Sequence, residues 1–563
     1  MHQKSCELKN QYAISCKELT FALIIVGLSC AVRILYALHY PLSNDEPQHL
    51  HVIWGWYHGL VQYRDIFDNH MPLFHILLSP LFSAIGERPT LMIWMRLAML
   101  PLFAVIIFCI YVIGASVFSK RVGLWAAVWT AVFPSMNLFI EFRTDILWAL
   151  CWFSCIAILV SGRLTIRRSA VAGFFAGLTF ATSLKTSFLA VALAASIVAT
   201  ILITRKSYHW AGQTSQLILK GCAFIVCLLI PPAVLVAYFY ARGATDSMYY
   251  CVVAHNLVLE REFFFRHLIS MSVVISVSLV CSVGLKRLEK SDTKMLRKTF
   301  IMLLAGFSFA MLQLWPVLTQ QDYAVILPAF LVVGAALIEF AQVSALKRRP
   351  FLPLRQLFPV IMAIQLGMVA IFAPWHSALT YNLQQWRDVL RMTDPDQTVM
   401  DLKGELIFRP RPYYYVVETF TSKRIHQGLL KDDIPEQMIA RGTCVANHPM
   451  NQGRMPARTG EFIKRNYVSV GTLLVAGKVL ERTSPTDRIE FEIELPAQYS
   501  LVSASGPATG LLDNEPVGQT VLLKPGRHFY QPRTTETKFA LVWSQALERG
   551  FWPVKIVKRN PQP

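Results

Sequence analysis

The sequence predicts a polytopic α-helical membrane protein that carries a separate β-rich domain at its C-terminal end. Hydrophobic residues make up 54% of the 563 residues and charged residues only 16%, which is too apolar for a soluble enzyme of this length. Long apolar runs recur as far as about residue 376 and then give way to alternating segments. Such runs are typical of transmembrane helices, and alternation is typical of strands.

The apolar runs predict about eleven transmembrane helices, because a helix needs roughly 20 residues to cross a bilayer. The candidate spans are 20–40, 91–118, 122–140, 144–162, 169–184, 187–204, 216–241, 267–285, 299–318, 323–343 and 355–376. Residues 169–184 and 187–204 also fit one broken unit around Lys185, so the number stays open by one or two. The first run lacks a small-residue cleavage site, and we expect a retained helix rather than a cleaved signal peptide.

Basic residues predict the orientation of these helices. Lys and Arg cluster in one alternate set of loops, at 120–121, 163–168, 205–220, 286–298 and 347–355. The opposite loop at 319–323 has none, and short basic loops stay in the cytoplasm. We therefore expect a cytoplasmic N-terminus and an extracytoplasmic C-terminus. Because topology accounts for most of the net charge of +19, we do not expect nucleic acid as a partner. Short loops and the lack of eukaryotic retention signals favour a bacterial inner membrane.

Residues 377–563 are expected to form a soluble extracytoplasmic domain, after a transmembrane domain at 1–376. The segments 488–495, 520–530 and 537–543 alternate in polarity between Pro and Gly residues, which predicts short strands. The earlier segments 410–420 and 432–440 indicate an α/β or α+β portion before these strands. The outer domain is therefore expected to change from α/β to β-rich along the chain.

Ionisable residues recur at the junctions that this topology places on the outer face. They are Asp45 and Glu46 after the first span, Glu141, Arg143 and Asp145 between the third and fourth, Lys185 between the fifth and sixth, and Asp322 and Tyr323 at the tenth. Ionisable groups at membrane depth are costly and usually face a cavity or one another. A lone acid would merely end and solvate its helix, but several such junctions together predict one cavity, for catalysis or for transport.

The residues 45–75, DEPQHLHVIWGWYHGLVQYRDIFDNHMPLFH, resemble the first external loop of GT-C-fold membrane glycosyltransferases, the group of protein O-mannosyltransferases and of the lipid A aminoarabinose transferase. The shared pattern is an acidic pair, a helix of aromatic residues, a Y-R-D segment and an N-x-x-P-L turn into the next span. The later segments EFRTD, SLKTS and QDYAVILP resemble family features in the same order, so the likeness covers roughly residues 20–345.

The resemblance implies an inverting enzyme that moves a hexosyl- or pentosyl-type sugar from a polyprenyl-phosphate donor to a lipid, glycan or protein acceptor, at the outer face and among membrane lipids. Such a reaction needs a carboxylate within hydrogen-bond reach of the acceptor hydroxyl. It also needs cations that stabilise the departing phosphate. By the resemblance, Asp45 is the base. Asp145 would orient the acceptor or bind a metal or a substrate amine, and Glu46 would assist either residue.

The donor phosphate is expected to contact Lys185 and Arg64, because ammonium and guanidinium groups are its usual partners. Arg143 and His70 are expected behind them. Relatives often have Lys at position 70, whereas an unperturbed His is mostly uncharged at neutral pH. The remaining predicted substrate-binding residues are Tyr63, Asp322 and Tyr323.

No cofactor is firmly expected, and a divalent metal ion is left open. Asp45, Glu46, His49, His51, His58 and His70 crowd one loop. Divalent ions accept such ligands, but no tight ligand spacing recurs. The main functional alternative is a membrane transporter or flippase for a glycolipid or polar solute, since buried acids and cations also mark ion pathways. A scaffold that presents its outer domain to envelope glycans is a third.

Overall fold

The computed structural model describes residues 14–205, 214–257, 261–288, 292–315, 318–346, 357–448, 452–482 and 488–553. The chain divides into two compact units. Unit 1 comprises residues 1–40, 69–77 and 93–377, and unit 2 comprises 41–68, 78–92 and 378–563. Unit 2 thus combines the C-terminal part of the chain with two early segments.

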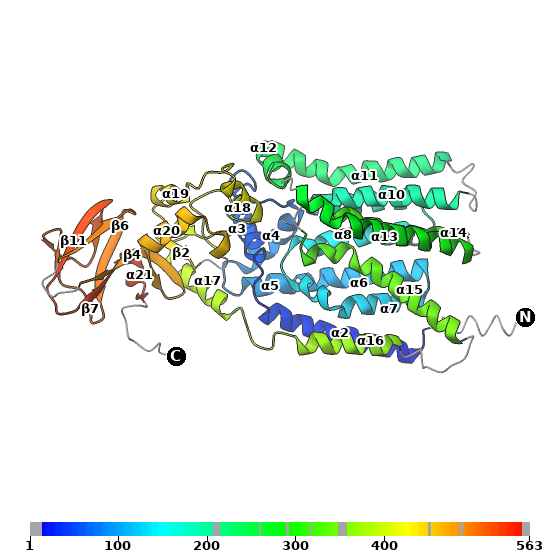
Figure 1. The fold of residues 1–563 in the computed structure, drawn as a ribbon, viewed down its shortest axis with the longest axis horizontal. Helices are drawn as coiled ribbons and strands as arrows, with labels where there is room; N and C mark the ends of the chain where they lie inside the picture. The colour runs from blue at the N-terminus through cyan, green and yellow to red at the C-terminus, as the bar shows by residue number, and fades with distance from the viewer. Residues whose placement is uncertain are drawn as a thin grey trace, which may run out of the picture. The chain divides into compact units, whose positions relative to one another are not determined.

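Unit 1 is a bundle of apolar helices that lie side by side (Figure 1). Its helices are α2 (Cys16–His39), α6 (Met99–Val117), α7 (Lys120–Val132), α8 (Thr144–Val160), α9 (Ile166–Thr182), α10 (Thr186–Thr204), α11 (Thr214–Ala241), α12 (Thr245–Tyr249), α13 (Arg261–Leu288), α14 (Asp292–Leu312), α15 (Leu327–Leu346) and α16 (Leu357–Ile371). The short segments η1 (Pro134–Ile140), η2 (Tyr250–Ala254) and η3 (Gln320–Val325) connect them. Helices α4 (Leu73–Ile85) and α5 (Leu91–Leu97) have residues in both units.

The helix lengths confirm a multi-pass membrane protein. Among the described residues, six helices are long and apolar enough to cross a membrane: Cys16–His39, Leu91–Val117, Thr186–Thr204, Ser215–Ala241, His267–Gly284 and Thr293–Leu312. Several further apolar helices are shorter, so the number of about eleven spans stays a prediction. Residues 169–184 and 187–204 lie in two helix segments, α9 and α10, that are interrupted around Lys185.

Small residues let the helices of unit 1 approach closely, as is common within membranes. A Cβ atom added at Gly173 of α9 would lie 2.1 Å from the Phe224 carbonyl oxygen of α11, and one at Gly177 would lie 2.4 Å from that of Leu228. The G-x-x-x-G spacing in the sequence therefore brings α9 and α11 into backbone contact. Substitution of either glycine would force these helices apart.

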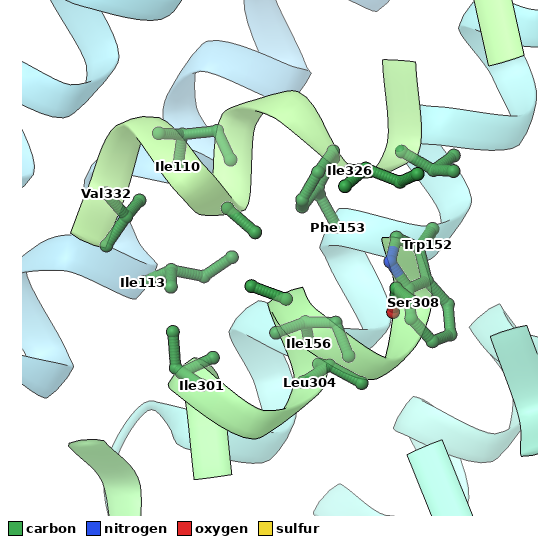
Figure 2. Close-up of a pocket in the computed structure, with 13 residues that line it drawn as sticks. Ile110, Ile113, Trp152, Phe153, Ile156, Ile301, Leu304, Ser308, Ile326 and Val332 are labelled. Atoms are coloured by element: carbon green, nitrogen blue, oxygen red, sulfur yellow. The ribbon is translucent and has the colours of Figure 1, made fainter. Parts of the chain in front are cut away.

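The centre of unit 1 is closely packed. Helices α6, α8, α14 and α15 enclose a cavity of about 10 Å³ that is lined mainly by apolar side chains such as Ile113, Phe153 and Leu304 (Figure 2). A cavity of this size has room for about one water molecule. It is too small for a sugar.

Unit 2 contains two sheets and several short helices. Its elements are α3 (Glu46–Tyr57), α17 (Thr380–Met392), β1 (Val399–Met400), α18 (Thr419–His426), α19 (Ile434–Ala440), β2 (Val445–Asn447), η5 (Gln452–Arg454), α20 (Ala457–Asn466), β3 (Tyr467–Val470), β4 (Leu473–Glu481), β5 (Ile489–Ile493), β6 (Ala497–Ser503), β7 (Gly506–Pro507), β8 (Gly510–Leu512), β9 (Glu515–Pro516), β10 (Val521–Leu523), β11 (Gly526–Pro532), β12 (Lys538–Trp543) and α21 (Ser544–Glu548). The β-rich C-terminal region predicted from alternation is therefore confirmed.

The larger sheet of unit 2 has the strand order β1-β2-β4-β12-β6-β10, with β3 also paired to β4 and β7 to β6. Strands β1 and β2 are parallel, whereas β4 and β6 both pair antiparallel with β12. The second sheet has the order β5-β11-β8-β9. Strand β5 shows why the alternation was informative, because Ile489, Phe491 and Ile493 are buried while Glu490 and Glu492 are exposed.

Candidate functional site

Four of the predicted residues form one charged cluster in unit 1. The Arg143 guanidinium donates a hydrogen bond of 3.0 Å to the Asp145 carboxylate. Arg143, Lys185 and His70 all lie within electrostatic range of that carboxylate. Residues from three separate junctions of the sequence therefore meet in one place.

The start of α8 positions Asp145. Residues 134–140 form the 3₁₀ turn η1, and Arg143 then occupies the N-cap position in extended conformation. Asp145 lies in the first turn of α8, where the helix dipole favours a negative charge. Glu141 accepts a hydrogen bond of 3.0 Å from the Gln321 side chain of η3 and lies 3.9 Å from the Arg143 Nε atom. A carboxylate is thus held on each side of Arg143.

Lys185 is presented by the sharp turn between α9 and α10, where it is the N-cap residue of α10. Its ammonium donates to the Asp322 carboxylate and lies 5.6 Å from the centre of the Trp315 ring, within cation–π range. The other Asp322 oxygen accepts from the Thr319 backbone N–H at 2.7 Å and closes a capping box on η3. Asp322 therefore links the Lys185 ammonium to the start of η3.

The structure places Tyr323 at the edge of the same region. It is half-buried, and its hydroxyl accepts a hydrogen bond of 3.3 Å from the Gln313 side chain. Like Asp322, it follows the start of η3, so the Q-Q-D-Y stretch of the sequence supplies polar groups to this cluster through one short turn.

In unit 2, Asp45 forms an ion pair that the sequence did not predict. The Lys403 ammonium lies 2.5 Å from the Asp45 Oδ1 atom. The Asp45 side chain is 25% exposed and that of Lys403 only 6%. Glu46, by contrast, is buried and accepts a hydrogen bond of 2.9 Å from the Ser43 backbone N–H, so it stabilises the start of α3. A partner for Asp45 was missed because 358 residues separate it from Lys403.

Tyr63 and Arg64 also belong to unit 2, and their roles differ. The Tyr63 side chain is fully buried, its backbone has a positive φ of 72°, and its carbonyl oxygen accepts from the Tyr414 hydroxyl. It therefore fixes the turn rather than presenting a surface. Arg64 is exposed, and its guanidinium makes a bidentate pair with Asp65 at 2.8 and 2.9 Å. A phosphate would have to share this guanidinium with Asp65.

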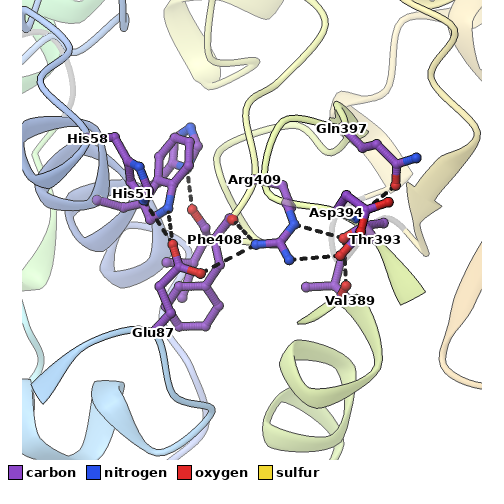
Figure 3. Close-up of polar contacts among 11 residues, drawn as sticks. His51, His58, Glu87, Val389, Thr393, Asp394, Gln397, Phe408 and Arg409 are labelled. Carbon is purple, nitrogen blue, oxygen red and sulfur yellow. Dashed lines mark hydrogen bonds and ion pairs between the residues drawn. The ribbon is translucent and has the colours of Figure 1, made fainter. Parts of the chain in front are cut away.

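Glu87 is a second residue that the sequence did not single out. Figure 3 shows that its carboxylate joins α3 to the C-terminal part of unit 2. It accepts from the Trp54 indole at 2.8 Å and the His58 ring at 2.9 Å, and its other oxygen lies 3.4 Å from Arg409. Arg409 is itself buried and donates to the Thr393 hydroxyl at 2.8 Å. These contacts fix the orientation of α3, and hence the place of Asp45, within unit 2.

The histidines of the first loop are distributed over separate contacts. The His51 ring donates to the Ile407 carbonyl oxygen at 2.7 Å, His58 contacts Glu87, and His70 belongs to unit 1. Within the part of the chain that the structure describes, no three His, Cys, Asp or Glu side chains lie close enough together to hold a metal ion.

The fold of the chain is similar to the GT-C fold of membrane glycosyltransferases. It is similar to the crystal structure of ArnT from Cupriavidus metallidurans bound to undecaprenyl phosphate, with a TM-score of 0.53 and 13% identity over 81% of this chain and 97% of that chain. The apo state of the same ArnT gives 0.51 and 12% identity over 81% and 98% of the two chains. The GT-C resemblance predicted from the sequence is thereby confirmed at the level of the fold.

A weaker similarity extends to the Archaeoglobus fulgidus oligosaccharyltransferase in complex with Zn and sulfate, with a TM-score of 0.46 and 11% identity over 96% of this chain and 98% of that chain. No protein-family model and no curated protein sequence matches the chain.

Proposed function

We propose that the protein is an integral-membrane glycosyltransferase that moves a sugar from a polyprenyl-phosphate donor to a lipid, glycan or protein acceptor. The observation that carries this proposal is the cluster in unit 1, where Arg143 is hydrogen-bonded to Asp145 and where Lys185 and His70 lie within electrostatic range of that carboxylate. The guanidinium and the ammonium suit the phosphate of a lipid-linked donor. The ArnT structure of the same fold is described as bound to undecaprenyl phosphate, which supports the same donor class here.

In the proposed reaction, the acceptor hydroxyl oxygen forms a bond to the anomeric carbon of the sugar. The bond from that carbon to the phosphate oxygen breaks, and polyprenyl phosphate leaves with the electron pair. Asp45 accepts the hydroxyl proton as general base. Lys185 and Arg143 stabilise the negative charge on the departing phosphate. Attack opposite to the leaving group inverts the configuration of the sugar.

We further propose that residues 1–376 are the catalytic membrane domain and residues 377–563 an extracytoplasmic domain. The distribution of Lys and Arg over alternate loops supports a cytoplasmic N-terminus and an outer C-terminus. A lipid-linked donor fits this orientation, since nucleotide sugars are not available outside the cell. A bacterial inner membrane is the location that we infer.

The test measures sugar transfer by the full-length protein in detergent, with radiolabelled polyprenyl-phosphate sugars and membrane extracts as acceptors. The D45N variant is expected to lose about 10²- to 10⁴-fold of the activity, the usual contribution of a general base. Because D45N leaves the buried Lys403 ammonium opposite a neutral amide, the double variant D45N/K403M is the matched control for folding.

Mass spectrometry of membrane glycolipids and glycoproteins, with and without the gene, identifies the acceptor. Unchanged glycan products would refute the proposed activity. A transporter or flippase would instead relocate an unmodified lipid and leave the set of glycosylated products the same.

A further inference from the structure

The segment 401–408 of unit 2 presents Lys403 to Asp45. The ammonium lies 2.5 Å from the carboxylate and is almost completely buried, whereas the carboxylate remains partly exposed. A buried ammonium is costly unless it is paired, so this contact is part of how the segment is folded. The segment therefore connects the C-terminal region to the carboxylate that we propose as the base.

The Asp45 carboxylate pairs with Lys403 and does not cap the helix that follows it. Asp45 is the N-cap residue of α3, a position where Asp usually accepts a hydrogen bond from the first turn. Among the described residues, however, its carboxylate makes no such cap bond, and its backbone is helical with φ −96° and ψ −23°. Glu46 serves the start of the helix through the Ser43 N–H instead. The Asp45 carboxylate instead forms an ion pair with Lys403.

Hydrogen bonds within the segment that carries Lys403 fix its conformation. The buried Asp401 carboxylate accepts from the N–H groups of Gly404 at 2.6 Å and Leu406 at 2.8 Å, and Glu405 accepts from the Lys403 N–H at 2.7 Å. Ile407 has a positive φ of 38°, which a β-branched residue adopts only when its surroundings impose it. Such strain is concentrated at functional sites, which is the first sign that this segment does more than close a loop.

The same segment packs directly on α3. The His51 ring donates to the Ile407 carbonyl oxygen at 2.7 Å. A Cβ atom added at Gly404, whose φ is 82°, would lie 2.6 Å from the His51 Cβ atom. On the other side, the Trp386 indole donates to the Glu405 carbonyl oxygen at 2.7 Å. The position of Lys403 relative to Asp45 is therefore fixed from both sides.

Several other titratable groups lie on the elements around this pair. They are Glu46, His49 and His51 on α3, Asp401 and Glu405 in the segment itself, and Arg411 just after it. Burial and the neighbouring Glu405 charge raise the pKa of Asp401, while the Arg411 charge opposes them. Lys403 is in direct contact with the Asp45 carboxylate.

We propose that Lys403 is the positioning residue of the catalytic base: it holds Asp45 ionised and oriented, so that the C-terminal region determines the pH range in which the enzyme works. This inference rests on the proposed function, since it names Asp45 as the base. Lys403 touches neither donor nor acceptor in this assignment and acts only through Asp45.

The test compares K403M and K403R with the wild type in the pH profile of kcat/KM. A cation next to a carboxylate lowers the pKa of that carboxyl by about 1–3 units, so in K403M the acid limb of the profile is expected to move upward by about 1–3 pH units. K403R keeps the charge and is expected to keep the acid limb within about half a unit of the wild-type position. The matched control is K538M, which breaks the exposed Lys538–Glu481 pair of 2.6 Å on the sheet and leaves the profile unchanged.

A second readout does not depend on turnover. Carbodiimide modifies protonated carboxyl groups, and mass spectrometry measures the pH midpoint of Asp45 labelling in each variant. The midpoint is expected to rise in K403M and to stay in K403R and K538M. Equal loss of activity at every pH with an unmoved midpoint would show a merely structural role and overturn the inference. If the labelling midpoint rises in K403M but the wild-type protein transfers no sugar, the proposed function is refuted. The effect of Lys403 on the ionisation of Asp45 is then still supported.

Discussion

Lowering the pH from 7.5 to 5 is expected to destabilise unit 2 through His51. The ring is buried, donates to the Ile407 carbonyl oxygen at 2.7 Å and stacks on Trp54 with ring centres 5.2 Å apart. Burial, together with the Arg411 charge, lowers the pKa of His51 from 6.5 to about 3, although the bond to Ile407 opposes this shift. The folded protein therefore keeps this ring neutral in mildly acidic solution.

The sign and size of the effect follow from the difference between the two states. As the pH falls through 6.5 the unfolded chain binds a proton at His51 and the folded chain does not, so stability is lost on the acid side. Each pH unit below 6.5 costs about 1.4 kcal/mol, which amounts to about 2 kcal/mol between pH 7.5 and pH 5. At pH 5 the folded ring is neutral for any pKa below about 4, and the unfolded-state pKa alone sets this magnitude.

The assay is thermal unfolding in detergent, followed by tryptophan fluorescence, for the wild type and for H51N. The Asn side chain still has an N–H to donate to Ile407, but it does not titrate in this pH range. All other titratable groups are the same in both proteins. The wild type is expected to lose about 4–8 °C more than H51N over this pH range, at 2–4 °C per kcal/mol for a unit of this size. Parallel pH curves for the two proteins would refute the reasoning.

Three further predictions concern unit 2. E87A removes the acceptor of the buried Trp54 indole and a partner of Arg409, and is expected to cost about 3 kcal/mol in unfolding free energy, whereas E87Q keeps an acceptor and costs less; equal melting temperatures for both variants would contradict this. G404A is expected to lower the melting temperature more than G428A, because both glycines have positive φ but only the added Cβ at 404 meets His51. For His528, burial lowers the pKa, but hydrogen bonds to Asp513 and the Lys524 carbonyl oxygen outweigh it and raise the pKa. That stabilisation is complete below about pH 6.5 and is lost as the pH rises through the folded pKa, so a pH-unfolding series should show it in the wild type and not in H528N.

The parts of the fold that the sequence predicts are those written in local patterns. Apolar runs predict the membrane helices, and alternation at 488–495 and 537–543 predicts β5 and β12. The sequence also indicated residues of the charged cluster of unit 1. Arg143 and Lys185 interrupt apolar stretches, where a charged side chain is energetically costly unless it has a partner or a function. What these predictions share is that each depends on fewer than about twenty consecutive residues.

The contacts that escape prediction join distant segments. Nothing near Lys403 indicates Asp45, since D-L-K-G-E-L reads as an ordinary polar loop and its partner is 358 residues away. Glu87 could not be identified from the sequence either, because its partners Trp54, His58 and Arg409 lie far from it along the chain. The grouping of residues 41–68 and 78–92 with the C-terminal region in unit 2 belongs to the same class. Long-range pairing depends on the whole fold and has no signature in a window of sequence.

The Lys185–Asp322 and Lys403–Asp45 pairs differ in which partner they expose, and this difference supports the roles proposed for them. In the Lys185–Asp322 pair the carboxylate is 1% exposed and the ammonium 19%. In the Lys403–Asp45 pair the ammonium is 6% exposed and the carboxylate 25%. The first pair therefore offers a cation to an incoming group, and the second offers a carboxylate. A phosphate binds to a cation, and a carboxylate accepts the proton of a hydroxyl group. Replacing the buried Lys403 is therefore expected to alter the pH dependence of the reaction, and replacing the buried Asp322 is expected to alter the affinity for the phosphate.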